Sequence, residues 1–265
     1  MSENVNQNAF EVESLEQYLI FRINRPHRLN AITSEVLDGL TTCIETLESQ
    51  SGNRGLIIIG SGERAFCAGT DLFERESLTD EQRLTKSDRA RDLLVRLHQA
   101  PFVSIAALNG LAYGGGLELA MACLFRISAP HVECSLPEVK IGLIPAYAGT
   151  QLLPMLIGRP RALDMMLTGR PVTAEEAFQL GLINRLASDD TPLIDQAADY
   201  LMSITQFSKV AVNAIRACAA VAGPQVTEQG LAIEREKVIE VGQSEDAVEG
   251  VTAFREKRKP VFNHR

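Results

Sequence analysis

The sequence predicts an α/β core over residues 1–190 and a helical region over residues 191–265. Two short runs, the wholly apolar Leu56–Ile59 and the mostly apolar Val103–Ala107, are typical of strands buried on both faces of a sheet. Amphipathic helical patterns separate such runs, and strands that alternate with helices favour βαβ units with right-handed crossovers. From Pro192 onward the periodicity is helical nearly to the end of the chain.

The N-terminal half contains two further strand and helix signals. Leu19–Ile23 is predicted as a strand, and the chain leaves it at Asn24-Arg25-Pro26. The helix that follows has an apolar stripe formed by Ile32, Val36, Leu40, Ile44 and Leu47. A second helix is predicted over residues 83–98, where the buried side chains are expected to be Leu93, Leu94 and Leu97.

Helix boundaries are marked in the C-terminal half. Thr173 and Glu176 have the spacing of a capping box, and Gly181 is placed to end the helix that they begin. Ser244 is a candidate cap for the last long helix. Its charges suit the helix dipole, because acidic residues begin it and basic residues end it: Glu245 and Asp246, then Lys257, Arg258 and Lys259.

Composition excludes several classes of protein. The formal net charge of −8 disfavours binding to nucleic acid or to an anionic membrane. The five cysteines are odd in number and scattered, with no C-x-x-C pair, and the four histidines have no ligand-like spacing, so no metal site is predicted. The polar start, residues 1–9, does not resemble a signal peptide, so a reducing cytoplasm is expected.

A glycine-rich turn carries the strongest chemical signal. Gly114, Gly115 and Gly116 follow a predicted buried strand and begin an apolar helix. Glycine lets a ligand approach the backbone, and the free N–H groups at a helix start favour negative charge. Glu118 follows one turn into that helix, where a buried carboxylate is costly unless it has partners or a task. A carboxylate would repel phosphate, so the turn is not predicted to be a phosphate cradle.

Two other fragments are weak functional signals when each is considered alone. Glu138, in Pro137-Glu138, would by itself be a surface loop residue. Around Gly69 the small residues again suit close approach of a ligand to the backbone, whereas Asp71 can simply cap the next helical segment.

Taken together and in order, these fragments resemble the crotonase superfamily, the enoyl-CoA hydratase/isomerase family, over nearly the full chain. The matching pieces are Arg25-Pro26-x-x-Leu29-Asn30-Ala31, Phe66-Cys67-Ala68-Gly69-Thr70-Asp71-Leu72, Asn109-Gly110 with Gly114-Gly115-Gly116-x-Glu118, Pro137-Glu138 with Gly142-x-Ile144-Pro145, Leu167-Thr168-Gly169-Arg170, Ala174 to Gly181-Leu182, and Phe254-x-Glu256-Lys257-Arg258-Lys259-Pro260.

The resemblance implies an active site. Glu118 and Glu138 would be the paired carboxylates of an enoyl-CoA hydratase of acyl-CoA metabolism, such as fatty acid β-oxidation, and the N–H groups of Thr70 and Gly115 would form the oxyanion hole. Coenzyme A is part of the substrate, so no separate cofactor is expected. Its contacts would be Arg28, Ala68, Gly69, Asp71, Leu72, Lys257 and Lys259. In one arrangement the two lysines come from a neighbouring subunit. Gly114 and Tyr147 would line the substrate pocket.

The resemblance also implies the fold and the assembly. The fold would be a crotonase-like spiral of ββα turns, and the C-terminal helices would build a homotrimer or homohexamer and cover the active site. Two positions depart from the commonest family pattern, since Thr70 stands where many relatives have alanine and Tyr147 lies in a usually glycine-rich stretch. Tyr147 could narrow the acyl pocket, donate a hydrogen bond to the acyl group, or only pack.

Three alternatives stay open. One is a different reaction on the same scaffold, above all isomerisation of an enoyl-CoA double bond, which needs one carboxylate. Another is a non-catalytic RNA-binding role, against which the acidic charge argues. The third is a serine hydrolase, but no G-x-S-x-G is present and Ser135 has only His131 as a candidate base. Acyl-chain length, pathway and direction are not determined by the sequence.

Overall fold

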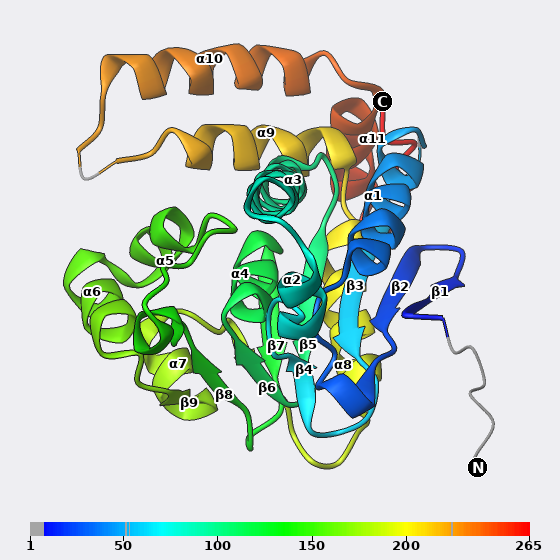
Figure 1. The fold of residues 1–265 in the computed structure, drawn as a ribbon. Helices are drawn as coiled ribbons and strands as arrows, with labels where there is room; N and C mark the ends of the chain where they lie inside the picture. Colours follow the sequence, from blue (N-terminus) through cyan, green and yellow to red (C-terminus); the bar gives the residue numbers. More distant parts are fainter. Residues whose placement is uncertain (1–7, 51, 53, 224) are drawn as a thin grey trace.

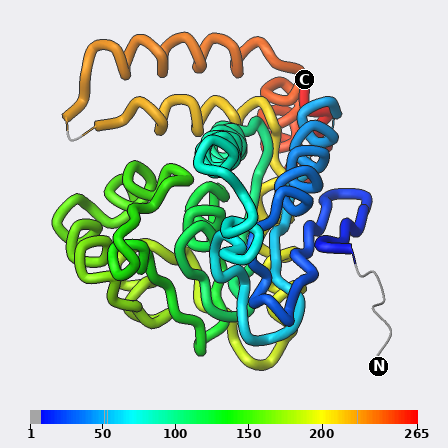
Figure 2. The backbone as a smooth tube through the Cα atoms, in the orientation of Figure 1, coloured from blue at the N-terminus to red at the C-terminus, as the bar shows by residue number. Residues whose placement is uncertain are grey.

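The computed structural model describes residues 8–50, 52, 54–223 and 225–265. Two sheets organise this part of the chain, and helices surround them (Figures 1 and 2). The larger sheet has the strand order β1-β2-β3-β5-β7-β10 and is parallel from β2 onward. Its strands are β1 (Phe10–Ser14), β2 (Tyr18–Ile23), β3 (Gly55–Gly60), β5 (Ser104–Leu108), β7 (Phe125–Ser128) and β10 (Arg185–Leu186).

The three strands predicted from the sequence, β2, β3 and β5, are the neighbouring inner strands of this sheet. The alternate residues of β3 show why this strand is apolar throughout. Leu56 and Ile58 face a core that includes helices α1 and α4, while Ile57 and Ile59 face helix α8. Both faces of the strand are therefore buried, as predicted. The helices named here are α1 (Ser34–Glu48), α4 (Gly115–Ala122) and α8 (Leu193–Thr205).

A smaller sheet has the order β4-β6-β8-β9, and its first three strands are parallel. Parallel neighbours end at the same edge of a sheet, so the loops that leave β4, β6 and β8 lie together. These loops contain the glycine-rich motifs and Glu138, which is why this sheet positions the candidate site. Its strands are β4 (Ala65–Cys67), β6 (Leu111–Tyr113), β8 (Glu133–Ser135) and β9 (Val172–Thr173).

Helix ends match most of the predicted signals. Asp71 caps α2 (Leu72–Ser77), accepting from the N–H groups of Phe73 and Glu74, and Ser244 caps α11 (Glu245–Glu256). Gly181 ends α7 (Ala174–Leu180) in a left-handed conformation, as expected. The capping box at Thr173 forms only in part, because Thr173 accepts from the N–H of Glu176 whereas the Glu176 carboxylate binds Arg170 instead. The ion pair with a nearby guanidinium has displaced the reciprocal hydrogen bond.

The remaining helices cover the sheets and extend beyond them. In Figure 1, α5 to α7 gather beside the smaller sheet, while α9 and α10 lie antiparallel to each other above α3, away from the strands. Apart from α1, α4 and α8, the described helices are η1 (Pro26–Arg28), α2 (Leu72–Ser77), α3 (Asp80–Gln99), η2 (Glu138–Ile141), α5 (Gly149–Ile157), α6 (Arg159–Thr168), α7 (Ala174–Leu180), α9 (Lys209–Ala220), α10 (Glu228–Gly242) and α11 (Glu245–Glu256).

The C-terminal helices differ in how they pack. Helix α8 covers one face of the larger sheet, with Ala197 and Leu201 in its core, whereas α10 has no buried residue. The predicted division at residue 190 stays a prediction. None of the helices described is both long and apolar enough to cross a membrane. Residues 1–7, most of the segment interpreted as no signal peptide, lie outside the described residues.

Candidate active site

A cavity of about 930 Å³ opens where the loops after β4, β6 and β8 meet helices α2 and α3. Most of the site residues predicted from the sequence line it: Arg28, Ala68, Gly69, Thr70, Asp71, Leu72, Gly114, Gly115, Glu118, Glu138 and Tyr147. The predicted coenzyme A contacts Lys257 and Lys259 do not line this cavity of their own chain, since they follow α11. Whether they serve a neighbouring subunit stays a prediction.

Glu118 is buried and held in one orientation. Its side chain is in the first turn of α4, and the residue is 1% exposed. Its Oε1 accepts two backbone N–H groups, from Tyr147 at 2.8 Å and Gly149 at 2.7 Å. Burial raises the pKa of Glu118 to about 7, although these two donors oppose the shift and the charge of Glu138 adds to it. The carboxyl group can therefore gain or lose a proton near neutral pH.

Glycine at position 149 makes this arrangement possible. A Cβ there would lie 2.7 Å from Glu118 Oε1, closer than a carbon and an oxygen can pack. The turn before it is strained, because Ala148 has φ of 80°, a left-handed conformation that costs a non-glycine residue about 1–2 kcal/mol. The strained residue lies between Tyr147 and Gly149, whose two N–H groups both donate to Glu118 Oε1.

Glu138 begins η2, directly after β8 and Pro137. Its Oε2 is buried and has no hydrogen-bond partner among the described residues. Burial raises the pKa of Glu138 as well. Gly114 leaves the space beside it, since a Cβ on Gly114 would lie 2.9 Å from Glu138 Oε1. A buried carboxyl oxygen without a donor favours the protonated form and has an unused capacity for a hydrogen bond.

Two residues that line the cavity, Thr70 and Gly115, have backbone N–H groups with no partner in the described part of the chain. Gly115 is the first residue of α4, so its N–H has no carbonyl within the helix to bind. Thr70 forms a bridge with Ile32 through the peptide groups on either side of it, and its own N–H makes no hydrogen bond within the described part of the chain. Gly69, with φ of 100°, lets the two loops approach, because a Cβ there would lie 3.1 Å from Gly115 N.

The expected coenzyme A residues have mixed roles. Asp71 pairs with Arg25 at 2.7 Å and caps α2, so its carboxylate is occupied within the chain. Arg28 lies over the ring of Phe73, 4.0 Å from the guanidinium carbon to the ring centroid. This cation–π pair joins η1 to α2 at the cavity and leaves a positive charge there.

One wall of the cavity was not predicted. Helix α3 and the loop around η2 contribute large apolar side chains, of which Leu84 is 64% exposed, Ile141 62% and Ile144 73%. The exposure of Leu84 could have been predicted from the sequence, because Leu84 lies among charged residues and outside the stripe of Leu93, Leu94 and Leu97 that faces the core. An apolar residue outside the buried stripe of a helix is available to a ligand.

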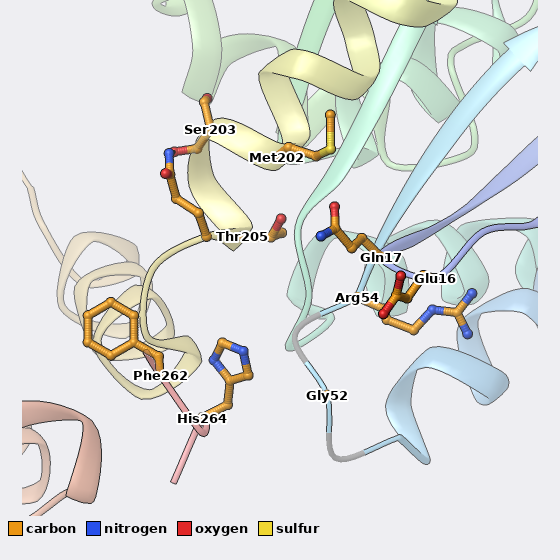
Figure 3. A pocket seen from close by; sticks show the side chains of 10 residues that line it. Glu16, Gln17, Gly52, Arg54, Met202, Ser203, Thr205, Phe262 and His264 are labelled. Carbon is orange, nitrogen blue, oxygen red and sulfur yellow. The ribbon is translucent and has the colours of Figure 1, made fainter. Parts of the chain in front are cut away.

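A second cavity of about 690 Å³ lies on another part of the molecule, between α8, the C-terminal tail and the turn after β1 (Figure 3). None of the predicted site residues lines it, and the Arg54 side chain on its wall already binds Gln50, Ser14 and backbone carbonyls. In the described residues no cluster of acidic, histidine or cysteine side chains could hold a metal ion. The first cavity is therefore the candidate active site.

Comparison with known proteins shows the family of the chain. The model of the enoyl-CoA hydratase/isomerase family matches residues 16–265. The chain belongs to this family. Its relatives include a probable enoyl-CoA hydratase of Bacillus subtilis, 38% identical over 88% of this chain and 90% of the relative. An enoyl-CoA isomerase/hydratase of Zymoseptoria tritici is 35% identical over 100% of this chain and 90% of the relative.

The fold of the enoyl-CoA hydratase/isomerase family is confirmed by solved structures. The crystal structure of an enoyl-CoA hydratase from Bacillus anthracis superposes with a TM-score of 0.91 at 33% identity, covering 98% of this chain and 100% of that one. The predicted crotonase-like α/β fold is thus correct. Family membership supports a crotonase-type reaction and does not by itself choose between hydration and isomerisation.

Proposed function

We propose that this protein is an enoyl-CoA hydratase, which adds water across the double bond of a 2-enoyl-CoA thioester. One observation supports the proposal most: two carboxyl groups, Glu118 and Glu138, line one cavity together with the amides of Thr70 and Gly115, which make no hydrogen bond among the described residues. Hydration needs an acceptor for the proton of water, a donor for the α-carbon and stabilisation of a negative oxygen. The cavity contains a candidate for each.

The amides would act on the thioester carbonyl. When water adds to the β-carbon, the electrons of the double bond move toward the carbonyl oxygen and give it negative charge. Two fixed N–H donors, from Thr70 and Gly115, would bind that oxygen more strongly in the transition state than in the substrate. One donor of this kind contributes roughly 3–4 kcal/mol in comparable sites.

The glutamates would move the protons. The two N–H donors on Glu118 favour its anion, so it is the proposed base that takes a proton from water as the oxygen bonds to the β-carbon. Glu138 has an oxygen with no donor, so it is the proposed acid that protonates the α-carbon. One carboxyl group gains a proton and the other loses one, and exchange with solvent restores both.

The coenzyme A portion would lie along the loop that leaves β4. Arg28, Ala68, Gly69, Asp71 and Leu72 are its proposed contacts, with Lys257 and Lys259 reaching the phosphates from a neighbouring subunit. Acid–base addition of water needs no electron transfer and no group carrier, so coenzyme A as part of the substrate is the only coenzyme proposed.

Isomerisation of the double bond is the second candidate. One carboxyl group can remove a proton from one carbon and return it to another, and the unpartnered Oε2 of Glu138 suits that task. Under this alternative Glu138 alone would carry the activity, whereas hydration requires Glu118 as well.

We also propose an assembly of three subunits or of two such trimers. Large apolar side chains on the C-terminal helices support it, because Val238 of α10 is 65% exposed and Phe254 of α11 is 85% exposed. Sedimentation as a monomer at micromolar concentration would contradict it. The cytoplasm is the proposed location, which the five free cysteines support.

The test is to replace each glutamate by glutamine and follow loss of the ultraviolet absorbance of conjugated enoyl thioesters, with short, long and branched acyl groups. We expect each change to lower kcat by roughly 10²–10⁴, while affinity for coenzyme A changes little. In the double variant the loss should fall short of the product of the two, since the groups act as a unit. Full hydratase activity of Glu118→Gln, or a wild type that isomerises 3-enoyl thioesters without hydrating the product, would refute hydration.

A further inference from the structure

Tyr147 touches three parts of the site at once. Its backbone N–H donates to Glu118, its hydroxyl lies 2.6 Å from Thr70 Oγ1, and its ring packs on the backbone of Gly115. The last contact is close, since a Cβ on Gly115 would lie 2.8 Å from a ring carbon of Tyr147. One residue thus links the carboxylate that is the proposed base, through its backbone, to both residues of the proposed oxyanion hole, through its side chain.

The hydrogen bond between the two hydroxyls has a preferred direction. Tyr147 is 4% exposed, and a buried phenol that loses its partner keeps an unsatisfied polar group. Burial raises the pKa of Tyr147 to about 12, so the phenol keeps its proton at neutral pH. A phenol is a stronger acid than an alkyl alcohol, so Tyr147 donates and Thr70 Oγ1 accepts.

This bond completes the attachment of Thr70. On one side the bridge to Ile32 holds the neighbouring peptides, through Ile32 N–H to Gly69 O at 2.7 Å and Asp71 N–H to Ile32 O at 3.0 Å. On the other side Tyr147 holds the Thr70 side chain. Gly69, which precedes Thr70, has φ of 100°, a conformation that favours glycine, and its N–H meets Cys67 Sγ at 3.4 Å. The direction of the Thr70 N–H therefore depends on these two attachments.

We propose that the Tyr147–Thr70 hydrogen bond is a positioning device, which aligns the Thr70 N–H with the Gly115 N–H and ties both to the loop that holds Glu118. The inference rests on the proposed oxyanion role of the two amides. Tyr147 is a positioning residue here, since its hydroxyl is turned to Thr70 and acts through it. A misplacement of catalytic groups by about 1 Å can cost up to 100-fold in rate, so a partial loosening has a measurable effect.

The competing explanation is that Tyr147 only fills space. Tyr147→Phe separates the two, because phenylalanine keeps the ring on Gly115 and removes only the hydroxyl. Thr70→Val removes the other hydroxyl at nearly constant shape, and Thr70→Ser restores one. Tyr113→Phe is a matched control: the Tyr113 hydroxyl binds Glu133 Oε2 at 2.9 Å, and its side chain does not line the cavity.

Two readouts are needed. The first is the red shift in the absorption of a cinnamoyl-CoA thioester on binding, which reports polarisation of the carbonyl and requires no turnover. The second is kcat and KM for the best enoyl-CoA substrate. We expect Tyr147→Phe and Thr70→Val each to reduce the red shift and to lower kcat about 10-fold, with KM within about twofold of the wild type.

The double variant should lose about 10-fold rather than the 100-fold of independent sites, because both changes break one bond. Thr70→Ser should keep kcat within about threefold, and Tyr113→Phe should match the wild type in both readouts.

A wild-type red shift in Tyr147→Phe and Thr70→Val would overturn the inference, and so would losses that multiply in the double variant. A wild type that polarises the thioester but hydrates nothing would refute hydration alone, with the positioning device still tested by the red shift. No red shift in the wild type would overturn both proposals.

Discussion

Replacing Glu118 by glutamine is expected to stabilise the folded protein at alkaline pH, although the same change removes the proposed base. Glutamine keeps the shape of the side chain, and its Oε1 can still accept the N–H groups of Tyr147 and Gly149. What changes is the charge. The folded protein disfavours the Glu118 anion, because burial raises its pKa from an ordinary 4.5 to about 7.

The direction of the pH effect follows from proton linkage. A carboxyl group whose pKa is higher in the folded state holds its proton longer there, so stability falls as pH rises from 4.5 to about 7. The cost of the Glu118 anion is then about 3 kcal/mol at pH 8 and under about 1 kcal/mol at pH 5. The glutamine variant has no such cost at either pH.

Thermal unfolding measures this difference. At about 2 °C per kcal/mol for a chain of this size, Glu118→Gln should melt about 6 °C above the wild type at pH 8 and no more than about 2 °C above it at pH 5. Glu63→Gln is the control, because Glu63 is an exposed loop residue and should show no pH-dependent gain. A glutamine variant that is no more stable than the wild type at pH 8 would refute the view that this carboxylate is held at a cost.

Two other substitutions test the local geometry. Gly149→Ala places a methyl group 2.7 Å from Glu118 Oε1, so we expect at least about a 10-fold loss of kcat in steady-state assays, and unchanged kinetics would contradict the contact. Arg25→Met removes the cation from Asp71, which is 3% exposed, and should lower the free energy of unfolding in urea by about 2–4 kcal/mol at pH 7. Hydrogen bonds from Glu74 N–H and Arg25 outweigh burial and lower the pKa of Asp71, so the stability that its anion provides is present at neutral pH and is lost as pH falls through the acid range. The Arg25→Met loss should therefore shrink at acid pH, and a loss that stays constant would contradict the ion-pair explanation.

The sequence alone determined the elements whose cause is local. The inner strands β2, β3 and β5 and the helix α1 were predicted because their apolar residues repeat with the period of a strand or a helix. Gly114, Gly115 and Glu118 were predicted as part of a site for a similar reason, since a strand, a glycine turn and a helix start are consecutive in the chain. Joining Glu138 and Thr70 to them required the resemblance to a family, because nothing local connects these segments.

The tertiary structure decided which distant groups meet. The carboxylate of Glu118 is held by amides 29 and 31 residues away, and the hydroxyls of Thr70 and Tyr147 are 77 residues apart. The sequence left three roles open for Tyr147, and in the structure its ring packs on Gly115 while its hydroxyl meets Thr70. The spacing of apolar residues along the sequence indicates which face of a helix or strand is buried. A hydrogen bond between two loops depends instead on where the parallel strands β4, β6 and β8 end in space.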